Sequence, residues 1–142
     1  PNSDAGNIPI IESINRFAEN NKNIKLYKNL DRITYVNLMR NASCLVGNSS
    51  SGILEAPSLH LPVVNIGPRQ VGRIHANNVI FVGYDKIEIK NAINYVLYDE
   101  TFRKNLRTCK NPYGDGTSSE KIVNILSELN IDDAILHKNI TY

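Results

Sequence analysis

Several features that mark other protein classes are scarce in this chain. Its 142 residues include no tryptophan and two cysteines, Cys44 and Cys109. Their spacing fits neither a metal-ligand motif nor a disulfide framework, and such sparing use of cysteine is typical of the reducing cytoplasm. We therefore expect a cytoplasmic protein with inert, packed cysteines and with no metal or other cofactor.

Charge of one sign and long apolar runs are also lacking. The chain carries 16 basic and 14 acidic residues, a net charge of +2, spread along its length. This balance gives no support for a nucleic-acid or membrane-surface partner. No apolar run approaches the roughly 20 residues that a membrane span needs. The 42% of hydrophobic residues suffices for one buried core, and the length suits one domain.

Helical and strand-like spacing of apolar residues alternate along the chain. Helical spacing or capping residues predict a helix from Pro9 to Phe17, one after Asp31, a short one over 53–56, helices over 86–98 and 100–107, and a last one opened by a capping box at Thr117-x-x-Glu120. Short apolar runs predict strands at 24–27, 44–47, 62–67 and 78–82. The alternation predicts an α/β fold with a parallel sheet.

The segment Gly47-Asn48-Ser49-Ser50-Ser51-Gly52 joins a predicted strand to a predicted helix. Small residues let a backbone approach a phosphate closely, hydroxyls add donors, and a helix start supplies N–H groups and a positive dipole end. In open α/β sheets such loops lie where ligands bind. The alternative is a plain serine-rich turn at the start of a helix. The segment is neither a Walker A loop nor a dinucleotide fingerprint.

Two further features accompany this loop. Glu55 is placed to accept hydrogen bonds from a ribose diol, although a first-turn carboxylate that merely favours the helix dipole is the simpler interpretation. Arg69 and Arg73 follow the strand 62–67 between glycines and resemble an anion clamp, with a solvated loop as the alternative. No nucleophile triad or carboxylate pair stands out, so no catalytic residue is predicted.

Four stretches together resemble the UDP-N-acetylglucosamine 2-epimerase family, and specifically its hydrolysing branch. They are residues 1–6 (PNSDAG), 47–57 (GNSSSGILEAP), 62–73 (PVVNIGPRQVGR) and 113–116 (YGDG), in family order and spacing. Non-hydrolysing relatives usually carry a Gly pair in place of Ser50 and Ser51, and they lack the Arg-Gln-x-Gly-Arg run. The resemblance covers the chain from Pro1 to about Leu129.

The resemblance implies a Rossmann-like C-terminal lobe of a glycosyltransferase-B-type fold, here residues 1–130, followed by a tail at 131–142. It assigns substrate-binding roles by family pattern. The Ser49–Gly52 loop holds the diphosphate, chiefly through Ser49 and Ser50, and Glu55 takes the ribose hydroxyls. Leu30 contacts uracil through its backbone, and Asn2 and Arg69 make further nucleotide contacts. The turn at 113–116 starts a helix that packs back towards the other lobe.

The implied reaction is loss of UDP from a UDP-2-acetamido sugar through a glycal, followed by hydration with inversion at C2. The product is N-acetylmannosamine or an analogue. In the family the acid–base carboxylates lie in the N-terminal lobe, so this chain alone is expected to be inactive. Its expected partners are the UDP-sugar, the N-terminal lobe of the same polypeptide and further copies in a homo-oligomer.

The chain opens at Pro1 without an initiator Met, and we expect it to be a piece of a longer protein that lacks the first two strands of its lobe. Strands 24–27 and 44–47 then either pair directly or have the gap between them filled from elsewhere. Two other functions stay open. They are the donor-binding lobe of a glycosyltransferase of the same architecture and a stand-alone nucleotide-binding module.

Overall fold

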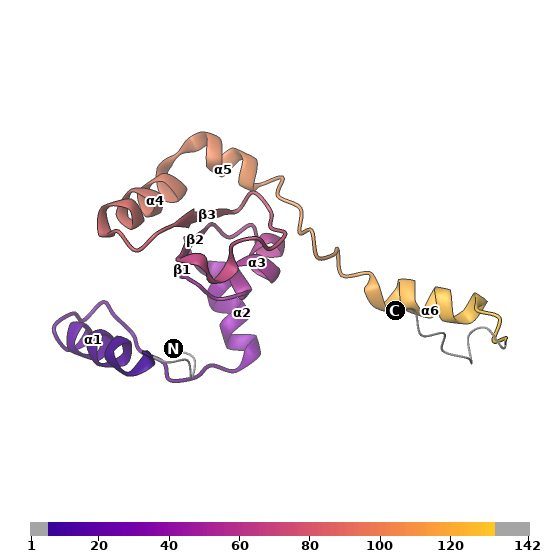
Figure 1. Cartoon of the computed structure of the whole chain (residues 1–142), viewed down its shortest axis with the longest axis horizontal. Coiled ribbons are helices and arrows are strands. Elements are labelled where there is room, and N and C mark those ends of the chain that lie inside the picture. The colour runs from indigo at the N-terminus through magenta and orange to yellow at the C-terminus, as the bar shows by residue number, and fades with distance from the viewer. Residues whose placement is uncertain (1–5, 133–142) are drawn as a thin grey trace, which may run out of the picture. The chain divides into compact units, whose positions relative to one another are not determined.

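The computed structural model of the chain describes residues 6–132 (Figure 1). The chain forms two compact units, Pro1–Leu38 and Met39–Tyr142. The predicted α/β class with a parallel sheet is confirmed, because three parallel strands in the second unit are flanked by helices.

The first unit holds helix α1, Asn7–Glu19, and most of helix α2, Arg32–Asn41. Pro9 lies in the first turn of α1, where a missing N–H breaks no helical hydrogen bond. Asp31 caps α2 as predicted, since its Oδ1 accepts a hydrogen bond of 2.9 Å from the N–H of Thr34. None of residues 6–38 is buried.

The strand predicted at 24–27 is wrong, because these residues have no regular secondary structure. Both Leu26 and Tyr27 are exposed. An extended segment is stable only when neighbouring strands satisfy its N–H and C=O groups. Within residues 6–132 no strand pairs with this segment. Direct pairing of 24–27 with 44–47 is one of the two alternatives left open above, and residues 24–27 form no strand that could take part in it.

The sheet of the second unit contains β1, Leu45–Gly47, β2, Val63–Ile66, and β3, Val79–Val82. The strands run parallel in the order β1-β2-β3. The three runs expected to form strands here are thus confirmed, with slightly shorter bounds. Parallel pairing places the carboxyl ends of all three strands at one edge of the sheet.

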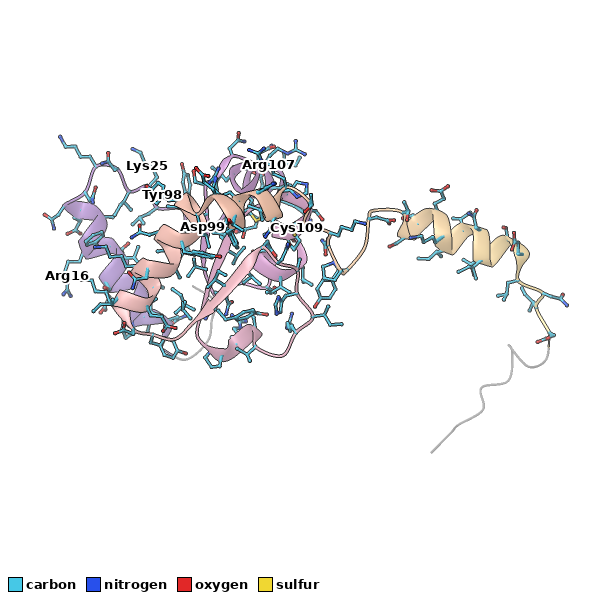
Figure 2. The ribbon with its side chains drawn as sticks, turned by 90° about the horizontal axis from the view of Figure 1, so that it is seen from above. Arg16, Lys25, Tyr98, Asp99, Arg107 and Cys109 are labelled. Carbon is cyan, nitrogen blue, oxygen red and sulfur yellow. The ribbon has the colours of Figure 1, made fainter. Side chains whose placement is uncertain are left out.

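Each face of β2 packs against a different element. Val64 belongs to a core on the face covered by α4, Lys86–Tyr98, and α5, Glu100–Leu106. Figure 2 shows Asp99 at the junction of these two helices, and its side chain caps α5 by accepting from the N–H of Phe102 at 2.7 Å. Val63 points to the opposite face and meets the short helix α3, Ser51–Leu54.

The last helix, α6, spans Ser118–Glu128. The predicted capping box is wrong, since the Thr117 side chain makes no cap hydrogen bond. Instead, Asp115 Oδ1 accepts from both the N–H and the hydroxyl of Thr117. These bonds to the charged form, with the nearby Lys121 ammonium adding a smaller effect, lower the pKa of Asp115 to about 2.

A search of the helices between residues 6 and 132 finds none with the length and hydropathy of a membrane span.

Candidate functional site

The loop after β1 turns sharply at the carboxyl edge of the sheet. Gly47 ends the strand with φ 147°, a conformation that residues with a Cβ rarely adopt. Asn48, Ser49 and Ser50 follow, and α3 then begins at Ser51, two residues before the predicted start. Ser51 and Gly52 therefore belong to the helix rather than to the open loop, and both are buried.

Hydrogen bonds within the loop fix its shape. Ser49 Oγ lies 2.9 Å from Ser51 Oγ and accepts a bond of 3.3 Å from the N–H of Ser51. The carbonyl of Ser49 accepts from the N–H of Gly52 at 3.2 Å. Two of the N–H groups expected to face a ligand are thus engaged inside the loop. The accessible side chains here are those of Asn48, Ser49 and, in part, Ser50.

Gly52 is required by close packing. A Cβ at this position would lie 2.8 Å from Cγ1 of Val63 and 3.7 Å from Cδ2 of Leu45. Val63 is a buried, β-branched residue in the central strand and has little freedom to move aside. The backbone of α3 can therefore lie directly on β1 and β2 only because residue 52 has no side chain.

Glu55 follows α3 and precedes a short 3-10 helix, η1, Ala56–Leu59. Its N–H donates to the carbonyl of Ser51 at 3.0 Å, and its side chain is half-buried, with one carboxylate oxygen inaccessible to solvent. Since Glu55 lies at the C-terminal end of α3, the simpler interpretation, a first-turn carboxylate favoured by the helix dipole, does not apply. A half-buried carboxylate beside the loop is suited to accepting hydrogen bonds from hydroxyl groups.

Arg69 lies on a matching turn after β2. The turn is the 3-10 helix η2, Pro68–Gln70, and Gly67 before it has φ 77°. The positive φ of Gly67 disfavours residues with a Cβ, and a Cβ here would also displace the exposed Tyr84 side chain, whose hydroxyl would lie 2.6 Å away. Arg69 is exposed, whereas the neighbouring Gln70 points inward and donates from Nε2 to the carbonyl of Asn48 at 2.8 Å. That bond joins the turn carrying Arg69 to the loop carrying Ser49.

Two predicted site residues are not among the described residues of the second unit. Leu30 belongs to the first unit, where it is half-buried and its N–H donates to Asn29 Oδ1 at 3.0 Å. Asn2 lies outside the described residues. The contacts predicted for Leu30 and Asn2 remain predictions.

Sequence reasoning missed three buried carboxamides, two near this edge of the sheet and one, Asn78, before the first residue of β3 and thus at the opposite edge. Besides Gln70, Asn65 donates to the carbonyl of Gly67 at 3.1 Å, and Asn78 donates to the carbonyls of Gly52 at 3.3 Å and Leu61 at 3.1 Å. One signal was available, because Asn65 interrupts the apolar run 62–67. A polar residue inside a buried strand needs hydrogen-bond partners, and the nearest carbonyls belong to the loops.

The remaining titratable groups offer little chemistry. Burial raises the pKa of both cysteine thiols, Cys44 and Cys109, which supports the prediction that they are inert. His60 Nδ1 lies 3.1 Å from the carbonyl of Leu106, and the ring of His75 packs against Phe81 with centroids 5.0 Å apart. Among residues 6–132 no three His, Cys, Asp or Glu side chains form a group able to hold a metal ion.

Comparison with known proteins gives a consistent result. The family model described as UDP-N-acetylglucosamine 2-epimerase matches residues 1–127. A UDP-N,N'-diacetylbacillosamine 2-epimerase (hydrolyzing) from Legionella pneumophila is 35% identical over 97% of the chain. A GDP/UDP-N,N'-diacetylbacillosamine 2-epimerase (hydrolyzing) from Campylobacter jejuni is 37% identical over 97% of the chain. In each case the chain spans 35% of the relative's length.

Solved structures agree with the sequence matches. A crystal structure of a UDP-N-acetylglucosamine 2-epimerase aligns with a TM-score of 0.69 and 26% identity, over 82% of this chain and 32% of its own. The Staphylococcus aureus MnaA–UDP co-structure aligns with a TM-score of 0.58 and 28% identity, over 73% of this chain and 28% of its own. The chain therefore belongs to the UDP-N-acetylglucosamine 2-epimerase family and spans about a third of the length of these relatives.

Proposed function

We propose that this chain is the UDP-binding part of a hydrolysing UDP-sugar 2-epimerase. The observation that carries the proposal is the bond of 2.8 Å between Gln70 Nε2 and the Asn48 carbonyl, which joins the serine loop and the arginine turn at the ligand-binding edge of the sheet. Family membership supplies the ligand class, because the S. aureus relative is a co-structure with UDP. The two hydrolyzing relatives and the solved structure with the highest TM-score given above are named 2-epimerases, which favours this function over a glycosyltransferase.

The accessible part of the site suits a diphosphate. Ser49 and Ser50 offer hydroxyl donors on the loop, and the arginine turn carries the guanidinium of Arg69, whose planar fork suits phosphate oxygens. Charge-assisted hydrogen bonds of this kind are about twice as strong as neutral ones. Ser51 and Gly52 contribute indirectly, because their packing in the protein interior fixes the backbone position of the neighbouring Ser49 and Ser50.

The nucleoside is assigned to Glu55, Leu30 and Asn2. Glu55 accepts hydrogen bonds from the ribose diol with the accessible part of its carboxylate, while Leu30 and Asn2 contact uracil. The sugar is an N-acetylated or diacetamido hexose, as in the names of the two hydrolyzing relatives. The reaction releases UDP and adds water with inversion at C2.

The proposal includes partners for this chain. The chain spans 35% of the length of the two relatives, so an N-terminal lobe of the same polypeptide is proposed to supply the base that removes the C2 proton. The chain alone then binds UDP but releases none from UDP-N-acetylglucosamine. We further propose a homo-oligomer in the cytoplasm, where both thiols stay reduced.

The ribose assignment is tested by calorimetric titration of Glu55→Gln and the parent with UDP and with inorganic pyrophosphate. Loss of charged hydrogen bonds predicts that Glu55→Gln weakens UDP by about 1–3 kcal/mol and leaves pyrophosphate nearly unchanged. The matched control is Glu120→Gln on the exposed surface of α6, which leaves both affinities unchanged. A drop in melting temperature with equal losses for both ligands would show that Glu55 acts in folding instead.

A further inference from the structure

The side chain of Gln70 connects the two loops that the proposed function uses together. It is 2% exposed, although its neighbour Arg69 on the same 3-10 turn is exposed. Two consecutive residues of one turn thus differ, because the side chain of Arg69 is exposed to solvent and the carboxamide of Gln70 is buried. The Nε2 atom then reaches across 22 residues of sequence to the carbonyl of Asn48 at 2.8 Å.

The chemistry of this contact fixes the orientation of the carboxamide. Only the NH₂ group can face a carbonyl oxygen, because a rotated amide would place two acceptors against each other. The other atom of the amide, Oε1, is buried and has no hydrogen-bond partner among residues 6–132. An unpaired buried acceptor costs about 1–3 kcal/mol, so a residue chosen for stability alone would not be Gln. Methionine or leucine would fill the same space without that cost.

We propose that Gln70 is a positioning residue for the diphosphate, which sets the distance between Arg69 and the hydroxyls of Ser49 and Ser50. This inference rests on the proposed function, because it assumes that the two loops bind one ligand. A ligand held from two loops is bound more tightly when the loops need no ordering on binding. The carboxamide supplies that order in the free protein, since it ties the Asn48 backbone to the turn that follows β2.

Another buried carboxamide, that of Asn78 at the opposite edge of the sheet, provides a useful contrast. Asn78 also donates to a backbone carbonyl near the loop, at Gly52, but it holds the buried start of α3 and not the exposed residues 48–50. Gln70, by contrast, joins residues 48–50 to the Arg69 turn through its bond to the Asn48 carbonyl. Substitutions at Gln70 are therefore expected to change the order of residues 48–50 without changing the packing of α3.

The test compares Gln70→Met with Val96→Ala, a core substitution on α4, in the full-length protein encoded by the gene. Amide hydrogen exchange, melting temperature and UDP affinity are measured for each. For Gln70→Met we expect exchange at residues 48–50 to accelerate and UDP affinity to fall by about tenfold, with a small change in melting temperature. For Val96→Ala, which is fully buried, we expect the melting temperature to fall while UDP affinity holds.

The readouts keep the two proposals distinct. Exchange at residues 48–50 is measured without ligand, so an unchanged rate in Gln70→Met overturns the positioning role whatever UDP does. If the parent protein binds no UDP, the proposed function fails while the exchange data still decide the loop contact. Gln70→Leu serves as a second variant. In the parent protein the carboxamide protons of Gln70 are expected to exchange slowly and to shift on UDP binding, and the absence of both effects would also overturn the role.

Discussion

Two parts of the molecule use similar apolar residues in different ways. One is the sheet with its covering helices α4 and α5, and the other is the pair of amphipathic helices α1 and α6. Val64, Val96, Phe102 and their neighbours form a closed core between the sheet and α4–α5. Helix α1 carries Ile10, Ile14 and Phe17 at helical spacing, and yet no residue of this fully described helix is buried. The same is true of α6. An apolar stripe therefore predicts a helix, but not what covers it.

The contrast also divides the site. The sheet that has the buried core carries the serine loop, Glu55 and the arginine turn. Hydrogen bonds from the buried carboxamides of Gln70 and Asn78 hold these segments in place. Leu30, which is proposed to contact uracil, belongs to the first unit, in which none of the described residues 6–38 is buried. Under the proposed function, the residues assigned to the phosphates are thus held in place before binding, whereas the residue assigned to uracil lacks such support among residues 6–38.

The largest expected effect comes from a matched pair of phenylalanines. Phe102→Ala opens a cavity in the core beside α5 and should lower the free energy of unfolding by about 3–5 kcal/mol. Phe17→Ala on α1, where the ring is 66% exposed, should cost less than about 0.5 kcal/mol. Urea denaturation of both variants of the 142-residue chain measures the difference. Equal losses would show that α1 has a core of its own.

A second experiment asks what covers α6. Leu126 is exposed in the chain, so Leu126→Ala should leave its stability unchanged. The hypothesis under test is that the proposed N-terminal lobe covers this face in the full-length protein. It predicts that the same substitution costs about 1.5–3 kcal/mol there, because the side chain would be buried. The matched control is Glu128→Ala on the same helix, which should be neutral in both proteins. No difference between the two proteins would contradict this role for α6.

Gly52→Ala tests the close approach of α3 to the sheet. The added methyl group meets Cγ1 of Val63 at 2.8 Å, so we expect a loss of about 1–3 kcal/mol through overpacking. Gly83→Ala is the control, since its Cβ would meet only the mobile end of the Glu88 side chain, at 3.1 Å. Thermal unfolding compares the two. If Gly52→Ala is as stable as Gly83→Ala, the loop does not depend on this contact.

The smallest effect concerns the start of α6. Hydrogen bonds from Thr117 lower the pKa of Asp115 to about 2 from an ordinary 3.8. A lowered carboxyl pKa means that the contribution to helix stability is fully present above pH about 3.8 and is lost as the pH falls through about 2. NMR titration of the Asp115 carboxyl carbon should give a midpoint near 2. In Thr117→Ala the midpoint should rise towards the ordinary value, and a midpoint unaffected by this change would contradict the assigned cause.

The sequence predicts most of the sheet and its helices because their signals are local. Asp85 and Asp99 cap α4 and α5, and the apolar runs around Val46, Val64 and Ile80 become β1, β2 and β3. The run at 24–27 carries the same local signal and fails, because a strand also needs a neighbour. At the site, Gly47 to Glu55 could be singled out from residue type and order. Gln70 could not be assigned a role, since its bond to Asn48 joins residues that only the fold brings together.

The central claim is that the serine loop at the carboxyl edge of the sheet binds the diphosphate of UDP. Calorimetric titration of the full-length protein with UDP tests it, comparing Ser50→Glu with Ser119→Glu, the same change at the exposed start of α6. A carboxylate beside the diphosphate should repel it, so Ser50→Glu is expected to weaken UDP binding by at least about tenfold, whereas Ser119→Glu leaves it unchanged. Equal UDP affinity in the parent and Ser50→Glu would contradict the claim and identify the loop as a structural turn.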